Sequence, residues 1–120
     1  MPILLLPWLL TGCTATFTNL SARHQVRNPN NLYPVSVALN TRQQSLRWET
    51  IEPFVVVGTD AFPMRPTPLM TNRWEGLIPV GSQTNVVFYH YKFDFKYNAF
   101  GGPQNDSASS PEYKLTILEQ

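Results

Sequence analysis

The sequence predicts an all-β protein, an antiparallel β-sandwich of about seven short strands. Three observations support this fold class. Eleven prolines divide the 120 residues into short pieces. No segment shows the 3.6-residue periodicity of an amphipathic helix, and several segments alternate apolar and polar residues as half-buried strands do. A small β-barrel is the competing architecture.

The clearest strand runs from Asn85 to Tyr97. Its odd positions from Val87 onward are apolar or aromatic, and its even positions from His90 to Lys96 are polar or charged. Alternation of this length predicts a strand with one buried aromatic face and one solvated face.

Shorter signals predict the other strands and the connections between them. Further strands are expected at residues 14–20, 33–40, 46–52, 54–57, 73–80 and 113–118. Connections are expected at residues 27–31, 41–45, 60–71 and 100–111. Pro53 predicts a break or a sheet edge between two of these strands, because proline cannot donate a hydrogen bond to a neighbouring strand.

Two of the connections are unusually long. Residues 60–71 contain three prolines and are expected to be irregular, and such connections are often functional. Residues 100–111 contain two consecutive glycines followed by proline, asparagine, aspartate and serine, which is typical of a mobile loop. We therefore expect the first connection to be offered to a partner and the second to lack regular structure.

The charge distribution excludes nucleic acid as a partner. Nine Lys and Arg balance eight Asp and Glu, and the arginines are scattered along the chain. Binding to phosphates needs a concentrated basic surface that displaces counterions.

Catalytic motifs are missing from the sequence. There is no Gly-x-Ser-x-Gly, and His24 and His90 are far apart. A metal site needs several ligands at short spacing, and no such set occurs, so we predict no catalytic residues, metal or cofactor. A small hydrolase that uses two carboxylates remains an alternative, which requires a cleft with two facing acids.

Aromatic side chains are the most abundant candidates for ligand binding. Trp48 and Trp74 are candidates to stack on sugar rings, and Tyr33 is a further candidate after them. The alternative is that these side chains pack between the sheets. Asp60 follows Gly58 in the long connection, and its carboxylate suits an oxygen-ligated Ca²⁺, although no acidic cluster accompanies it.

The first thirteen residues resemble a bacterial lipoprotein signal. Residues 3–10 are mostly apolar and precede Leu10-Thr11-Gly12-Cys13, which resembles a lipobox. The apolar run is too short for a membrane-spanning helix and has the length of a signal-peptide core. The resemblance implies that residues 1–12 are removed, that Cys13 carries a lipid, and that residues 13–120 form a single domain. The alternative is a buried N-terminal strand with an ordinary core cysteine.

This resemblance also implies a location. Two or three acyl chains hold a protein firmly to a membrane. In Gram-negative lipoproteins, an Asp directly after the lipidated cysteine tends to signal retention in the inner membrane. Position 14 of this chain is Thr. The expected location is therefore the cell envelope, at the outer membrane.

A second resemblance concerns residues 60–96. Phe62-Pro63-Met64, Arg73-Trp74-Glu75 and the strand ending at Phe95 are similar to elements of starch-binding and early-set immunoglobulin-like modules. The resemblance implies an immunoglobulin-like sandwich, and more weakly a carbohydrate ligand, because a fold does not fix a function.

The sequence as a whole favours a lipid-anchored envelope protein that acts by non-catalytic binding or assembly. One sheet face or residues 60–71 would contact an envelope protein partner. The alternative is a cell-surface carbohydrate-binding module that binds polysaccharide through exposed aromatic rings.

Overall fold

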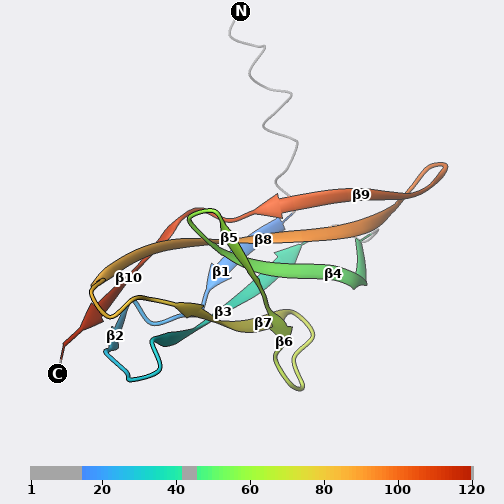
Figure 1. Cartoon of the computed structure of the whole chain (residues 1–120). Helices are drawn as coiled ribbons and strands as arrows, with labels where there is room; N and C mark the ends of the chain where they lie inside the picture. Colours follow the sequence, from blue (N-terminus) through green and yellow to red (C-terminus); the bar gives the residue numbers. More distant parts are fainter. Residues whose placement is uncertain (1–14, 42–45, 120) are drawn as a thin grey trace, which may run out of the picture.

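A computed structural model describes residues 15–41 and 46–119 (Figure 1). The described chain forms ten strands and no helix. The strands are β1 (Ala15–Asn19), β2 (His24–Val26), β3 (Leu32–Thr41), β4 (Leu46–Val57), β5 (Asp60–Pro63), β6 (Arg65–Pro66), β7 (Arg73–Pro79), β8 (Val86–Ala99), β9 (Gly102–Ser109) and β10 (Tyr113–Leu118). Within these residues, no helix is long and apolar enough to cross a membrane.

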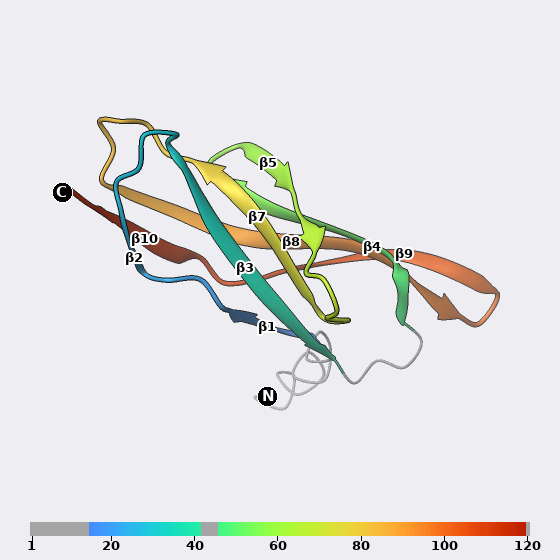
Figure 2. The same cartoon turned by 90° about the horizontal axis from the view of Figure 1, so that it is seen from below.

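The strands form two sheets that pack face to face, as Figures 1 and 2 show from two directions. One sheet has the order β1-β3-β7-β6, and the other has the order β2-β10-β8-β4-β5 with β9 beside β8. All pairs are antiparallel except β2 with β10, which is parallel. This order matches the two sheets of an immunoglobulin-like sandwich and confirms the predicted fold class. The structure has more strands than the seven expected.

The core lies between the two sheets and is rich in aromatic residues. The largest fully buried side chains come mainly from β3 and β8, and no polar or charged residue within the described ranges is buried. These side chains are Tyr33, Val35, Val37, Val55, Ile78, Tyr89, Tyr91, Phe93 and Leu115. The predicted inward face of β8 is thus confirmed at its central positions, Tyr89, Tyr91 and Phe93.

Hydroxyl and amide groups fasten the N-terminal segment across the core. The chain leaves the first sheet after β1 and joins the second sheet at β2. The Tyr91 hydroxyl donates to Asn19 Oδ1 at 2.7 Å, and Asn19 Nδ2 donates to the Tyr89 hydroxyl at 2.9 Å. Ser21 Oγ lies 3.1 Å from the Tyr91 hydroxyl and accepts from the Ser36 amide at 2.8 Å. The polar ends of the aromatic core are therefore satisfied where the chain changes sheets.

Pro53 was predicted to mark a break or a sheet edge. The break is wrong, whereas the edge fits, because β5 pairs only with residues 54–57 of β4. β4 continues through Pro53 and pairs it with Phe93 of β8. The Pro53 carbonyl accepts from the Met64 amide at 2.9 Å, so its backbone points away from β8. Proline is tolerated there because the amide hydrogen that it lacks would have faced the β5 side. The register of β4 against β8 shifts between Arg47 and Glu52, and Thr50 Oγ1 accepts from the Lys96 amide at 2.8 Å in that gap.

Two predicted connections contain strands. Residues 60–66 hold β5, which pairs with β4, and β6, which pairs with β7, so the chain changes sheets at Met64. The prediction of a mobile loop at residues 100–111 is wrong, because β9 pairs with β8 over eight residue pairs from Lys92↔Ser109 to Ala99↔Gly102. The resulting β8–β9 hairpin projects beyond the rest of the sandwich (Figure 1).

Candidate functional site

Trp48 and Trp74 stack on each other at the edge of the core. Trp74 of β7 is buried at 6% exposure, and Trp48 of β4 is 40% exposed. Their rings are parallel within 2°, with centroids 6.3 Å apart, and Trp74 also meets Phe93 edge-on at 5.0 Å. Trp74 therefore packs in the core, whereas part of Trp48 remains open to solvent.

The other residues singled out from the sequence are not close together. Tyr33 is fully buried, and its hydroxyl accepts from the Asn28 amide at 3.1 Å, so it presents no ring face to a ligand. Asp60 is exposed beside the β4–β5 turn. Among the residues that the structure describes, no three His, Cys, Asp or Glu side chains are placed to hold a metal ion. Cys13 lies outside the described residues.

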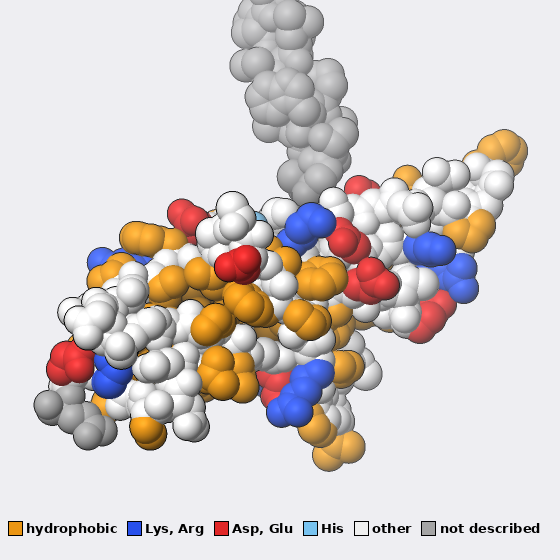
Figure 3. Space-filling view, in the orientation of Figure 1, with side chains coloured by type: hydrophobic (Ala, Val, Ile, Leu, Met, Phe, Trp, Pro, Cys, Tyr) orange, Lys and Arg blue, Asp and Glu red, His pale blue; other side chains and the backbone are white. Residues whose placement is uncertain are grey.

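An apolar groove follows the open edge between β5 and β7. Apolar side chains gather over this region in the centre of the face in Figure 3. The groove encloses about 780 Å³. Its lining comes from β3, β7 and the sheet-changing segment and comprises Pro34, Val35, Ser36, Phe62, Pro63, Met64, Arg65, Glu75, Gly76 and Leu77.

Met64 and Gly76 shape the floor of this groove. A β-carbon on Gly76 would lie 3.2 Å from Met64 Cγ, so the absent side chain allows Met64 to pack against β7. Arg65 and Glu75 form an ion pair at 3.2 Å at the rim, and Leu77 is 51% exposed. The groove thus combines an apolar wall with a charged rim.

The edge of β7 beside the groove is partly uncovered. β6 pairs only with Trp74 and Glu75, and no strand among the described residues covers 76–79 on that side. The Arg73 carbonyl accepts from the Thr67 amide on the same edge. Residues two apart in an antiparallel strand point their backbone groups to the same side. The amide and carbonyl of Leu77 therefore face the open edge.

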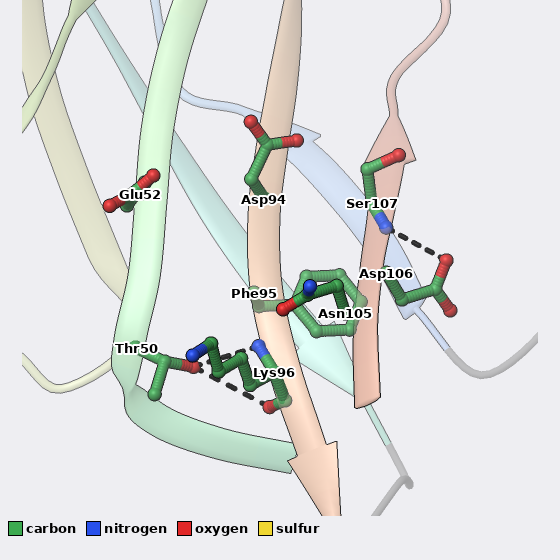
Figure 4. A pocket seen from close by; sticks show the side chains of 8 residues that line it. All are labelled: Thr50, Glu52, Asp94, Phe95, Lys96, Asn105, Asp106 and Ser107. Carbon is green, nitrogen blue, oxygen red and sulfur yellow. Dashed lines mark hydrogen bonds between the residues drawn. The ribbon is translucent and has the colours of Figure 1, made fainter. Parts of the chain in front are cut away.

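A second hollow is polar and lies on the outer face of β4, β8 and β9 (Figure 4). It encloses about 590 Å³. Its lining residues are Thr50, Glu52, Asp94, Phe95, Lys96, Asn105, Asp106 and Ser107. Figure 4 shows that these side chains come from three neighbouring strands, and the register of β4 against β8 shifts beside them.

Glu52 and Asp94 are cross-strand neighbours in this hollow. Asp94 is bonded to Lys92 Nζ at 3.1 Å, and Glu52 is exposed. A carboxylate pair that hydrolyses glycosides needs one acid set apart from the other by an apolar pocket. The hollow therefore brings together two acids, as the hydrolase alternative requires, but both lie at an open surface with a mostly polar lining.

Perturbed titratable groups lie outside both hollows. Burial raises the pKa of the Tyr91 hydroxyl well above its ordinary value, and the hydrogen bond with Ser21 opposes this shift. Burial also raises the pKa of Tyr113. Both shifts arise from burial of hydroxyl groups in the aromatic core.

We compared the chain with models of protein families, with curated proteins and with solved structures, and none of these comparisons found a match.

Several exposed apolar residues could not be predicted from the sequence. Leu77, Leu69 and Phe100 are exposed apolar side chains, and single apolar residues near turns have no periodic signal that would set them apart. Segment 60–71 was selected for its length, and part of it lines the apolar groove.

Proposed function

We propose that the chain is a lipid-anchored envelope protein whose sandwich binds an extended segment of a partner protein without catalysing a reaction. The observation that supports this function best is the apolar groove beside the uncovered edge of β7. An extended peptide would hydrogen-bond to the Leu77 backbone and place an apolar side chain in the groove. Addition of a strand to a sheet edge combines backbone affinity with side-chain specificity in this way.

The edge has only part of the protection that natural sheets use against unwanted pairing. Pro79 removes one donor and β6 blocks two residues, yet the backbone of Leu77 is open and its side chain is exposed. The uncovered edge lies beside an apolar groove, and this combination favours binding of a specific partner segment, because the groove adds side-chain selection that a bare sheet edge lacks.

Site-specific photocrosslinking tests the groove. A photoreactive phenylalanine analogue replaces Leu77 in one protein and Phe88 in a control, because the two residues are similarly exposed at 51% and 52%. We expect one envelope protein to crosslink at position 77 and not at position 88. A Leu77→Asp chain without the analogue should fail to compete for this partner. Equal crosslinking at both positions, or none, contradicts binding through the groove.

The anchor has a separate test. Mass spectrometry of the protein from its native membrane should detect a chain that begins at Cys13 and carries acyl groups there. An intact Met1 together with a free Cys13 thiol contradicts the lipid anchor.

A carbohydrate-binding function is the second candidate, and the observation in its favour is Trp48. Its ring rests on Trp74 and is 40% exposed, so a sugar would meet an aromatic face that is already fixed in position. Trp48→Ala should abolish retardation of the protein in gels that contain the ligand polysaccharide, whereas Leu77→Ala should not. If no envelope polysaccharide retards the unaltered chain, this candidate is withdrawn.

A further inference from the structure

Two apolar side chains in the described chain are fully exposed. Leu69 and Phe100 have relative exposures of 103% and 105%, whereas the other exposed large apolar residues lie between 39% and 52%. The latter are partly covered by strand neighbours, as ordinary surface residues are. Leu69 and Phe100 contribute almost nothing to the packing of the fold, so their apolar character needs another explanation.

Both residues lie at the same end of the sandwich, which we name the Ala15 end. β1 begins there with Ala15 paired to Thr41. The β6–β7 connection that contains Leu69 is fixed to this end, because the Leu39 amide donates to the Asn72 carbonyl at 3.0 Å. The β8–β9 turn that contains Phe100 lies beyond the start of β4 (Figure 2). Figure 3 shows apolar side chains at the tips of both connections.

Leu69 occupies a turn position that normally favours glycine. The Met70 amide donates to the Thr67 carbonyl at 3.1 Å, and Leu69 has a φ of 66°. With Pro68 before it, this is the geometry of a type II turn, whose third residue is usually glycine or asparagine. A leucine there gains no burial and adopts a disfavoured backbone conformation. The fold therefore gives no reason for leucine at this position.

Phe100 lies at a turn that leaves its ring free. Ala99 pairs with Gly102, so Phe100 and Gly101 form the two-residue turn, and Gly101 has a φ of 96°. The glycine supplies the positive φ that the turn needs. Phe100 is free to be any residue as far as the turn is concerned, and the hairpin carries its ring away from the core.

We infer that the Ala15 end docks on a lipid bilayer by inserting Leu69 and Phe100. The inference rests on the proposed lipid anchor at Cys13. Cys13 precedes Ala15 by two residues, and two residues of chain span at most about 7 Å, so an anchor there would tether this end to the membrane. The two tips belong to different sheets and are separate points. A bilayer accepts separate apolar insertions, whereas a protein interface is built on a contiguous buried patch.

The opposite end of the sandwich is closed by polar contacts. Arg27 donates to the Gly81 carbonyl at 3.0 Å, to the Thr84 carbonyl at 2.8 Å and to Glu119 Oε2 at 2.8 Å. The hydrogen bond from Arg27 lowers the pKa of Glu119 below its ordinary value. That end is thus built to face water. The Ala15 end also carries charge, in the Arg47–Glu49 ion pair at the start of β4, so what distinguishes it is the pair of fully exposed apolar tips.

Fluorescence quenching in vesicles tests the docking. Cys13 is the only cysteine, so an anchored chain with Leu69→Cys or Phe100→Cys offers one free thiol for an environment-sensitive dye. Leu77→Cys and Phe88→Cys are matched controls on strand faces. The vesicles contain phosphatidylethanolamine and phosphatidylglycerol with brominated acyl chains. We expect several-fold stronger quenching and a blue-shifted emission at positions 69 and 100 than at positions 77 and 88.

A second variant separates lipid contact from folding. Leu69→Asn suits the positive φ, so it preserves the turn and the unfolding midpoint. When Leu69→Asn is combined with the dye-labelled Phe100→Cys, the ratio of docked to undocked protein should fall about tenfold. This is the loss expected when one leucine side chain no longer inserts into the bilayer. Loss of quenching with an unchanged midpoint supports insertion.

The outcomes distinguish the docking from the anchor. Equal quenching at all four positions in an anchored chain overturns the docking, and so does a shift at positions 69 and 100 that appears only when envelope proteins are added. If a second dye molecule attaches at Cys13, the Cys13 thiol is free and the anchor is contradicted. The quenching pattern of that unanchored chain with added vesicles then tests the docking by itself.

Discussion

The two halves of β8 have the same sequence pattern and different surroundings. Tyr89, Tyr91 and Phe93 in the first half are at most 1% exposed. Phe95 and Tyr97 continue the same alternation, yet they are only half-buried. The first half lies under the four-stranded sheet, whereas the second half enters the β8–β9 hairpin, which projects past that sheet (Figure 1).

This difference shows what alternation measures. The period of two assigns each side chain to a face of the strand. Burial of that face depends on a second sheet that lies above it, and the strand's own sequence does not contain this information. The first half therefore stabilises the fold, and the second half is available for other contacts.

The largest expected effect comes from truncation in the first half. Phe93 contacts Phe17 edge-on at 5.1 Å and Trp74 at 5.0 Å. Phe93→Ala removes these contacts and leaves a cavity, so the free energy of unfolding should fall by about 3–5 kcal/mol. Urea unfolding followed by circular dichroism measures this change.

The matched control for this prediction is Phe95→Ala, two residues further along the same face. Its loss should be less than half as large, because Phe95 is only half-buried. Equal losses for the two variants would mean that the hairpin is packed as tightly as the core, and the contrast between the halves of β8 would be wrong.

The fold was predictable from the sequence where one face of a strand is buried. β8 and β10 alternate clearly, and their inward residues Tyr91, Leu115 and Ile117 are buried as expected. β9 was missed because most of its side chains are exposed, so its sequence has no alternation of apolar and polar residues. The choice between a break and an edge at Pro53 could not be made from the sequence, because it depends on which neighbour the proline backbone faces, and that is a property of the sheet.

The candidate site was less predictable than the fold. Trp48 and Trp74 were indistinguishable in the sequence, and only the packing of β4 against β7 makes one exposed and one buried. The apolar groove arises where segment 60–66 changes sheets at Met64, and no local pattern announces such a crossing. The segment could be selected for its prolines and its length, but its uncovered neighbour β7 could not.

The second prediction removes one hydroxyl from the buried half of β8. Tyr91→Phe removes the 2.7 Å hydrogen bond to Asn19 Oδ1, which keeps its 3.3 Å hydrogen bond from the Ser21 amide, so the free energy of unfolding should fall by about 0.5–1.5 kcal/mol. Tyr97→Phe, in the half-buried part of the strand, should cost less than about 0.5 kcal/mol. Chemical unfolding of both variants measures the difference, and similar values would contradict a structural role for the Tyr91 network.

The same hydroxyl predicts sensitivity to alkaline pH. Burial raises the pKa of Tyr91 in the folded state, whereas an unfolded tyrosine ionises near pH 10. The stability contributed by neutral Tyr91 is therefore complete below about pH 10. Above that pH the unfolded state loses the proton first, and stability falls by about 1.4 kcal/mol per pH unit for this one group. Unfolding midpoints from pH 8 to 11 should fall less steeply for Tyr91→Phe, and identical slopes would contradict the assignment.

A smaller and local effect is expected in the projecting half. Gly102 has a φ of 125°, a conformation that other residues adopt only at a cost of about 1–3 kcal/mol. Gly102→Ala should loosen the β8–β9 hairpin and accelerate amide hydrogen exchange from Asp94 to Ser107. Exchange in the first half of β8 should not change, because the hairpin opens independently of the core. Faster exchange at Tyr89 and Tyr91 would show that the two halves unfold together.

The smallest effect on stability is expected at Phe100, at the far end of the same hairpin. Its ring is fully exposed and the positive φ of the turn falls on Gly101, so Phe100→Asn should change the free energy of unfolding by less than about 0.5 kcal/mol. An aromatic side chain that the fold does not use, at the tip of a paired hairpin, is expected to serve contacts outside the chain. If Phe100→Asn instead destabilises the protein as Phe93→Ala does, the ring packs on this chain in solution, and Phe100 is no longer available for lipid.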